Sequence, residues 1–195
     1  MSAKQHNHYK LYKPFGMLSQ MTSNEDRQNR TKRFLGELYD FPEGIMPVGR
    51  LDGKSEGLLL MTTDGKLSDT INRFGIEKEY YAQLDGEIPN GAIELMEKGV
   101  EIGFEGKRYV TKPCNVQRLP FDIKLPEADK SIRIGRHRPN SWISITIREG
   151  KFRQVRKMTA AVGFPTLRLV RVRIGKMTLG TMEPGTVQPV SDLLY

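Results

Sequence analysis

The chain has 195 residues, of which 37% are hydrophobic and 28% charged, and its formal net charge is +8. A globular chain of this length can bury a core, in one domain or in two small lobes. The longest apolar run, Leu58–Met61, is far short of the roughly 20 residues of a membrane-spanning helix. The polar residues 1–10 argue against a secretory signal, and the single cysteine, Cys114, excludes an internal disulfide. We therefore expect a cytoplasmic protein that has no membrane partner.

The first half of the chain predicts a mixture of short strands and helices. Residues 1–8 are expected to form a disordered polar tail, and Tyr9–Tyr12 predicts a strand that ends at a Pro/Gly turn signal. The polar stretch 23–31 predicts a loop, and Thr31–Asp40 predicts a helix capped by Thr31. Residues 57–63 are apolar and predict a buried strand, after which Asp64-Gly65 begins a helix that runs to about Phe74.

The second half continues in mixed order. It predicts a strand over 79–84, a helix over 89–98 that stops at Gly99, strands over 108–119 broken at Pro113, and a long loop over 120–140. Residues 142–148 alternate as a strand, 152–162 have helical periodicity, and 166–174 predict a last strand. This order favours an α+β fold with a largely antiparallel mixed sheet flanked by helices, and not a doubly wound parallel sheet.

The positive charge is concentrated in residues 148–176, which hold nine Lys and Arg and one acidic residue, Glu149. On the predicted helix, Phe152, Val155, Thr159 and Val162 form a core-facing stripe, and Arg153, Arg156 and Lys157 lie on the adjoining face. Cations near a helix N-terminus are unfavourable unless an anion, such as a phosphate or a carboxylate, lies nearby. A solvated basic face would also fit, but the further arginines Arg168, Arg171 and Arg173 favour a nucleic-acid surface.

The segment Gly49–Ser55 has the composition of a phosphate-binding loop, but only three residues separate Gly49 from Gly53-Lys54-Ser55, where that motif needs four. What remains is Asp52 in a Gly-rich loop directly before a buried strand. Such an aspartate is either a catalytic group or a turn-forming residue, and the pattern does not separate the two. His6 and His8 make an incomplete metal site, so we expect no bound metal.

Four segments taken together resemble the pseudouridine synthases of the small-subunit synthase (RsuA-like) group. They are Lys13-Pro14-Phe15-Gly16; Gly49-Arg50-Leu51-Asp52 with the following 55–62; Lys78-Glu79-Tyr80; and the basic stretch from Glu149 to Leu169. The resemblance covers roughly residues 9–190 with the motifs in order. It implies the pseudouridine synthase catalytic fold over 9–195, as one domain or as two lobes joined around 120–140.

The resemblance also implies an isomerase that converts a uridine of RNA to pseudouridine without metal or organic cofactor. Asp52 matches the catalytic aspartate, which acts at ribose C1′ either as a nucleophile or by supporting an elimination. Tyr80 matches the aromatic residue that stacks on the target base, and Arg156 matches the basic partner of the aspartate. The substrate-binding residues expected from the same motifs are Arg50, Lys78, Lys151, Arg153, Gln154, Arg168 and Leu169. The target uridine must be flipped out of the RNA, and phosphate contacts, including one from Arg171, offset that cost.

Most of the group carry an N-terminal S4-type RNA-binding domain, and the eight residues before the first strand cannot hold one. We therefore expect the catalytic domain itself to select the target. The resemblance points to 23S ribosomal RNA as the substrate. We also expect the protein to be a monomer. Two alternatives stay open at this point: a synthase for 16S ribosomal RNA or another RNA, and a non-catalytic RNA-binding protein of ribosome assembly.

Overall fold

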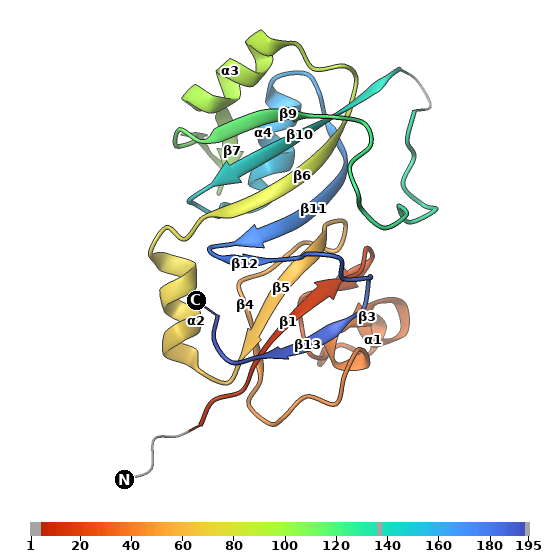
Figure 1. The fold of residues 1–195 in the computed structure, drawn as a ribbon, viewed down its shortest axis with the longest axis vertical. Helices are drawn as coiled ribbons and strands as arrows, with labels where there is room; N and C mark the ends of the chain where they lie inside the picture. Colours follow the sequence, from red (N-terminus) through yellow and green to blue (C-terminus); the bar gives the residue numbers. More distant parts are fainter. Residues whose placement is uncertain (1–4, 136–137, 194–195) are drawn as a thin grey trace. The chain divides into compact units, whose positions relative to one another are not determined.

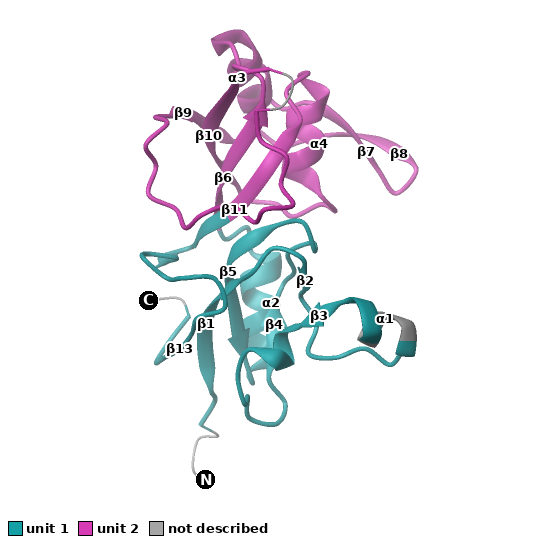
Figure 2. Ribbon diagram, turned by 90° about the vertical axis from the view of Figure 1, so that its right-hand side faces the viewer, with its two compact units in different colours: residues 1–76, 171–195 teal, residues 77–170 magenta. Residues whose placement is uncertain are grey.

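The computed structural model describes residues 5–135 and 138–193 (Figure 1). Contacts divide the chain into two compact units (Figure 2). Unit 1 is made of residues 1–76 and 171–195, and unit 2 of residues 77–170. The predicted connection over 120–140 lies within unit 2. Each unit has its own strands and helices.

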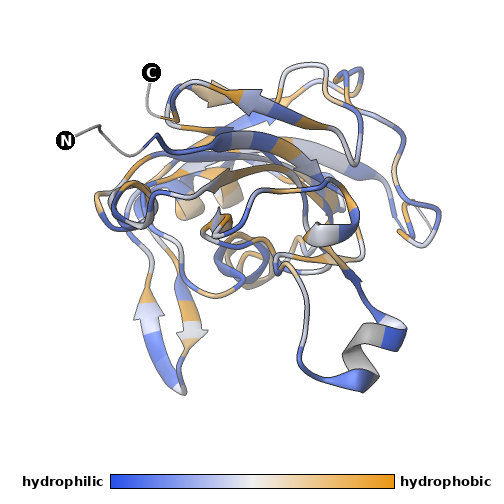
Figure 3. Cartoon of the chain, turned by 90° about the horizontal axis from the view of Figure 1, so that it is seen from below, coloured by the Kyte–Doolittle hydropathy of each residue, from blue (hydrophilic) through white to orange (hydrophobic). Residues whose placement is uncertain are grey.

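Unit 1 is built around the strand β1 (His8–Lys13), which lies between two antiparallel neighbours, β5 (Glu56–Thr62) and β13 (Val187–Val190). The short β4 (Met46–Val48) also pairs antiparallel with β5. All seven residues of β5 are buried, as the apolar run predicts. Hydrophobic and hydrophilic residues alternate along several strands (Figure 3). The buried ones form a core cluster of Tyr9, Leu11, Met17, Leu35, Leu59 and Met61.

The helix α2 (Gly65–Arg73) follows β5 and confirms the prediction for this segment. It begins where expected because the Asp64 side chain accepts hydrogen bonds from the amides of Lys66 (2.9 Å) and Leu67 (3.1 Å), two of the donors that a helix start leaves unpaired. Ile71 is buried, and the helix ends at Phe74, which is 74% exposed.

The segment between β1 and β4 differs from the prediction. The predicted loop over 23–31 contains the helix α1 (Asp26–Thr31), and the predicted helix over 31–40 is wrong. In its place are β3 (Arg33–Phe34), which pairs in parallel with β2 (Met17–Leu18), and a 3-10 helix, Leu35–Glu37.

Contacts distant in sequence explain this difference. The Leu35 and Gly36 amides donate to the carbonyls of Gln20 (2.8 Å) and Met21 (3.3 Å). These acceptors are distant in sequence, whereas a helix over 31–40 would pair the two amides with carbonyls one turn earlier. The Glu37 carboxylate accepts from the Phe34 amide at 2.7 Å. Backbone groups that are satisfied in this way no longer need helical bonds, and the tertiary contacts override local propensity.

Unit 2 contains the antiparallel strands β6 (Lys78–Asp85), β10 (Asn140–Ile147) and β9 (Asn115–Leu119), with β10 in the middle. The helix α3 (Asn90–Lys98) packs near β9, and α4 (Gln154–Ala161) packs against β7 (Glu101–Phe104). The strand β7 forms an antiparallel hairpin with β8 (Lys107–Val110). The alternation of residues along β10 suggests that only one face of this strand is buried. In the structure Trp142 and Ser144 are buried along with Ile143 and Ile145, so both faces of β10 are covered.

The strand β11 (Thr166–Ile174) carries the chain from unit 2 back into unit 1, and its end pairs antiparallel with β12 (Met177–Thr178). The predominance of antiparallel pairs, the parallel β2–β3 pair and the separate helices confirm the predicted α+β class. Within the described ranges, no helix is both long and apolar enough to cross a membrane. Of the predicted N-terminal tail, residues 1–4 lie outside the described residues, and His8 already belongs to β1.

Candidate active site

Asp52 lies in the loop between β4 and β5, which pair antiparallel with Val48 opposite Leu60. The loop begins at Gly49, whose backbone has a φ of +68°, and a Cβ there would lie 2.8 Å from Asn72 Oδ1. Glycine is therefore the residue that this position accommodates without strain. The Ser55 amide donates to the Asp52 carbonyl at 3.0 Å and closes a turn directly before β5.

Hydrogen bonds on both sides of Asp52 join the same loop to Gly16 and Ser19, which lie just before and just after β2. The buried Ser19 hydroxyl donates to the Leu51 carbonyl (2.8 Å) and accepts from the Leu51 amide (3.0 Å). The Gly16 amide donates to the Gly53 carbonyl at 2.7 Å. Asp52 itself is half-buried, and its Oδ1 is shielded from solvent. These bonds hold the backbone of the aspartate in one position, which a catalytic group requires.

A buried lysine lies beneath this loop. Lys13, the last residue of β1, is 0% exposed, and its Nζ donates to the carbonyls of Pro14 (2.8 Å) and Met17 (2.7 Å). Burial lowers the pKa of the Lys13 ammonium from 10.5 to about 8, although attraction by Asp52 and then by Glu56 raises it. The charge of Lys13 is thus close enough to Asp52 for the two to attract each other.

Two further charged side chains of unit 1, Glu56 and Arg171, are buried close enough to Lys13 to influence its charge. The Tyr12 hydroxyl donates to Glu56 Oε2 at 3.1 Å, and Arg171 Nε donates to the Leu58 carbonyl of β5 at 2.8 Å. Arg171 is only 3% exposed, and its charge also lowers the pKa of Lys13. The prediction that Arg171 contacts phosphates on an RNA surface is therefore wrong. Residues 168–171 are consecutively buried, which shows that β11 is covered on both faces at this point.

Unit 2 holds Tyr80 and Lys78 on β6. Tyr80 lies opposite Ile145 of β10 and Lys78 opposite Ile147, and both side chains are 8% exposed. Their burial follows from the same period of two that places Ala82 and Leu84 inside. At 8% exposure, only a small part of the Tyr80 ring is accessible to solvent or to a ligand. The roles predicted for Tyr80 and Lys78 stay predictions.

The turn before α4 is organised by Glu149, which accepts hydrogen bonds from the Tyr109 hydroxyl, the Lys112 amide (2.9 Å) and Gln154 Nε2 (2.6 Å). Burial pushes the pKa of Glu149 upward, but these three hydrogen bonds outweigh burial and lower it. Gln154, a predicted RNA contact, is 3% exposed and also accepts from the Lys151 amide at 3.0 Å. Its polar atoms thus hold the turn together.

The helix α4 begins at Gln154, two residues later than predicted. Arg153 precedes it in the left-handed conformation (φ 54°, ψ 34°), which is uncommon for a non-glycine residue. As a result Phe152 is 67% exposed, and its predicted place on the core stripe is wrong. Val155 and Thr159 are buried as predicted. Arg156 is half-buried, and its Nη1 donates to the Thr166 carbonyl at 3.1 Å.

The remaining predicted contacts divide by exposure. Arg50 and Arg153 are exposed, Lys151 is half-buried, and Arg168 and Leu169 are 4% and 5% exposed. Asp52 and Arg50 belong to unit 1, whereas Tyr80, Arg156 and the other predicted contacts belong to unit 2. The pairing of Arg156 with Asp52 therefore stays a prediction. Within the described residues, no cluster of three or more His, Cys, Asp or Glu could hold a metal ion.

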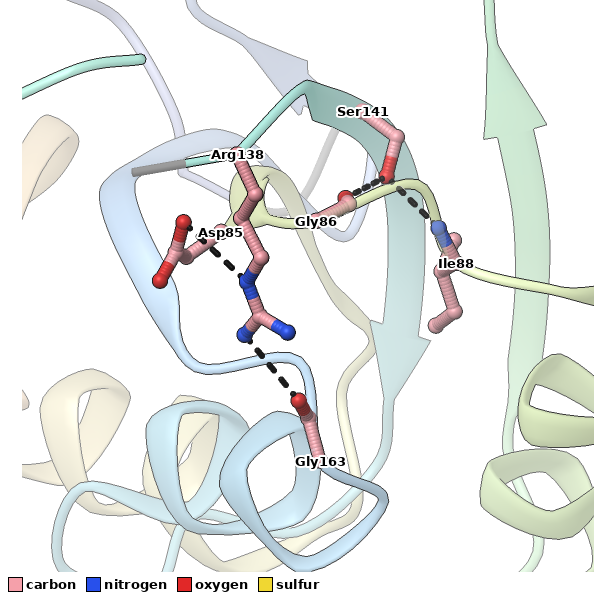
Figure 4. A network of polar contacts seen from close by, with 6 residues as sticks. All are labelled: Asp85, Gly86, Ile88, Arg138, Ser141 and Gly163. Carbon is pink, nitrogen blue, oxygen red and sulfur yellow. Dashed lines mark hydrogen bonds and ion pairs between the residues drawn. The ribbon is translucent and has the colours of Figure 1, made fainter. Parts of the chain in front are cut away.

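The end of the long loop that leads into β10 is fastened inside unit 2 (Figure 4). Arg138 pairs with Asp85 at the end of β6 (Nε to Oδ1, 3.3 Å) and donates to the Gly163 carbonyl after α4 (3.2 Å). The Ser141 hydroxyl donates to the Gly86 carbonyl (2.7 Å) and accepts from the Ile88 amide (3.1 Å). This network joins the ends of β6 and α4, the two elements that carry Tyr80 and Arg156.

The family model described as RNA pseudouridylate synthase matches residues 7–161, a range that contains the β4–β5 loop, β6 and α4. The chain belongs to the RNA pseudouridylate synthase family. As a member of this family it is an RNA uridine isomerase. The match includes Asp52, Tyr80 and Arg156 but ends before Arg168 and Leu169.

Curated relatives agree with this membership. Ribosomal large subunit pseudouridine synthase E of Xanthomonas campestris pv. campestris is 41% identical over 176 residues, which cover 89% of this chain and 90% of that protein. The protein of the same name from Vibrio vulnificus is 38% identical over 181 residues, covering 92% and 73%. Ribosomal large subunit pseudouridine synthase B of Bacillus subtilis is 32% identical over 166 residues, covering 84% and 59%.

Solved structures share the fold. A crystal structure of a pseudouridylate synthase has a TM-score of 0.73 and 25% identity, and covers 97% of this chain and 72% of that chain. A Cbf5–Nop10–Gar1 complex has a TM-score of 0.54 at 14% identity, covering 89% and 50%, and so is similar in fold alone.

Two structural features of the site escaped the sequence prediction. Lys13 belongs to the first motif of the family resemblance, but the sequence does not show that it is a buried cation close to Asp52. The available signal is the strand period of two, which places Lys13 on the same face as Tyr9 and Leu11. In the sequence Glu149 stands out only as the one acidic residue of a basic stretch, whereas in the structure it accepts the hydrogen bonds that fix the start of α4. No local pattern shows that role, because its partners Tyr109 and Lys112 lie about forty residues earlier.

Proposed function

We propose that this chain isomerises one specific uridine of 23S ribosomal RNA to pseudouridine, with Asp52 acting at ribose C1′. The large-subunit target is supported by the names of relatives that are 41% and 40% identical over nearly the whole chain. The observation that carries the role of Asp52 is its loop, which is anchored on both sides by Ser19 and Gly16. The proposed catalytic domain spans 9–195 and works as a cytoplasmic monomer without metal or cofactor.

In the proposed reaction the bond between N1 of uracil and C1′ breaks, the base turns, and a bond forms between C5 and C1′. The proton on C5 is released to solvent and N1 gains a proton, so no redox partner is needed. Asp52 either forms a covalent bond to C1′ or stabilises the positive charge that develops there, as carboxylates do in glycoside chemistry. The buried ammonium of Lys13 is close enough to Asp52 for the two charges to attract each other, so a cation stands beside the proposed catalytic group.

Tyr80 and Arg156 complete the proposed site. Tyr80 would stack on the uracil, and its buried position on β6 between fixed neighbours would give the base a rigid platform. Arg156 would pair with Asp52, and its bond to the Thr166 carbonyl would keep the guanidinium oriented. Because the reacting atoms lie inside a stacked RNA, the uridine must be flipped out, and the exposed Arg50 and Arg153 would offset that cost at the phosphates.

The test is tritium release from a 23S transcript labelled at C5 of uridine, since formation of the C5–C1′ bond frees that hydrogen. The wild type should release one equivalent per transcript, whereas Asp52→Asn should release none while still binding the transcript. Asp69→Asn is a matched control, because Asp69 lies in unit 1 and pairs with the exposed Arg73 at the surface of α2. Release by Asp52→Asn at the wild-type rate would remove Asp52 from the mechanism.

A further inference from the structure

Phe152 is the most informative side chain that the proposed reaction does not use. A phenylalanine that is 67% exposed leaves apolar surface in water, and here it lies in the most basic part of the chain. The conformation of the backbone explains this exposure. The left-handed Arg153 turns the chain before α4, so that Val155 enters the core and Phe152 does not. An uncommon backbone conformation of this kind is retained where the surrounding structure enforces it, often at functional positions.

Two lysines arrange the aromatic rings around this turn. Lys157 Nζ lies over the Phe152 ring, 5.4 Å from its centroid. Lys151 Nζ lies 4.8 Å from the centroid of Phe104 and 5.0 Å from that of Tyr109, on the two strands of the β7–β8 hairpin. All of these residues belong to unit 2. We call Phe104, Tyr109, Lys151, Phe152 and Lys157 the aromatic–cation surface.

Hydrogen bonds make this surface a fixed structure. Lys157 Nζ also donates to the Gly103 carbonyl of β7 at 2.6 Å, which links α4 to the hairpin. Tyr109 is held by Glu149, which also binds Gln154 at the start of α4. The Phe104 and Tyr109 rings meet at a centroid distance of 6.1 Å and an angle of 61°. The side chains are therefore arranged before any ligand arrives, which lowers the entropic cost of binding.

The net positive charge of the aromatic–cation surface favours a polyanionic ligand. Residues 101–112 and 149–157 together carry seven Lys and Arg and three Glu, so the two segments are net positive. Of the three acids, Glu101 pairs with Arg108 (3.5 Å) and Glu149 is bound within the turn. Exposed rings among cations are how proteins bind single-stranded nucleic acid, because any base can stack on a ring while Lys and Arg contact the phosphates.

We infer that the aromatic–cation surface binds an unpaired stretch of the RNA substrate, with one nucleobase stacked on Phe152 and the neighbouring phosphates contacted by Lys151, Arg153 and Lys157. Lys157 occupies one face of the ring, so the base takes the exposed face. This base is not the reacting uridine, whose proposed platform is Tyr80. The inference rests on the proposed function only in taking RNA as the ligand, and it gives the enzyme a second point of contact from which to select its target.

The test uses a twelve-nucleotide oligoadenylate that contains one 2-aminopurine. It has no uridine, so its binding does not depend on catalysis. For the full-length chain, Phe152→Ala should weaken binding between about fivefold and 150-fold, the range for loss of one base–aromatic stack, and should abolish the quenching of 2-aminopurine fluorescence. Phe152→Trp should retain both signals. Phe74→Ala is the matched control, because Phe74 is similarly exposed (74%) but lies in unit 1 beside α2, and it should bind as the wild type does.

Three outcomes would overturn the inference: unchanged binding by Phe152→Ala, equal losses in Phe152→Ala and Phe74→Ala, or full binding by Phe152→Leu, which would indicate an apolar contact without stacking. Circular dichroism of each variant checks that it is folded. The proposed function is tested separately, in the tritium-release assay. A chain that binds oligoadenylate through Phe152 but releases no tritium would contradict the isomerase reaction and leave the inference about Phe152 intact.

Discussion

The buried charge of Lys13 predicts a stability that rises in alkaline solution. The pKa of this ammonium is about 8 in the folded chain and 10.5 in the ordinary, solvated state. Between these two values the unfolded chain binds more protons than the folded one, so the free energy of unfolding increases with pH. Each pKa unit corresponds to about 1.36 kcal/mol, and the full window of 2.5 units is therefore worth about 3 kcal/mol.

Lys13 titrates gradually in both the folded and the unfolded chain. Between pH 7 and pH 9.5 the free energy of unfolding should therefore increase by about 2 kcal/mol of this total. Lys13→Met isolates the effect, because methionine fills similar space and does not titrate. Its loss of the hydrogen bonds to Pro14 and Met17 alters stability equally at both pH values. Urea unfolding followed by circular dichroism should thus show that wild type gains about 2 kcal/mol relative to Lys13→Met between pH 7 and 9.5.

The matched control is Lys66→Met, which removes an exposed lysine near the start of α2 in the same unit. The difference in stability between this variant and the wild type should be the same at both pH values. A wild-type advantage over Lys13→Met that does not change with pH would show that Lys13 is solvated and titrates normally, and would contradict its burial as a charged group.

Three further results are expected. Because a neutral Lys13 no longer attracts Asp52, the turnover rate of the wild type should fall as the pH rises through about 8, and a rate that stays constant from pH 7 to 9.5 in the tritium-release assay would exclude this attraction from catalysis. Leu59→Ala should lower the free energy of unfolding by about 2–5 kcal/mol, because Leu59 is 0% exposed in the core cluster of unit 1; a loss below about 1 kcal/mol in urea would mean that the site is loosely packed. Ser141→Ala should cost about 1–3 kcal/mol and speed hydrogen exchange at the Ile88 amide, whose acceptor it removes, and unchanged exchange there would contradict the network in Figure 4.

The sequence predicted those elements whose signals are local. The strand β5 is a continuous apolar run, and α2 follows a capping aspartate, so pattern and structure agree. The segment 31–40 could not be predicted in this way, because the spacing of Phe34, Leu35 and Leu38 suits a helix equally well. The bonds that decide against a helix come from Gln20 and Met21, outside the window that periodicity examines.

The identity of the candidate site residues could be predicted from motifs, but the burial and the contacts of the residues around them could not. The family resemblance identified Asp52, Tyr80 and Arg156, whereas charge patterning wrongly placed Arg171 on an RNA surface. An arginine between valines on a strand is normally taken as solvent-facing, and only the bond to the Leu58 carbonyl shows why Arg171 is buried. Helical periodicity wrongly places Phe152 in the core for a related reason, because it does not show that Arg153 adopts a left-handed conformation just before the helix.

The most direct test of the central claim is a carbodiimide map of pseudouridine in ribosomal RNA from cells that lack this protein. One pseudouridine of 23S ribosomal RNA should disappear in these cells, return when the wild-type chain is supplied, and not return with Asp52→Asn. Identical maps with and without the protein, a missing site in 16S ribosomal RNA alone, or restoration of the site by Asp52→Asn would contradict it.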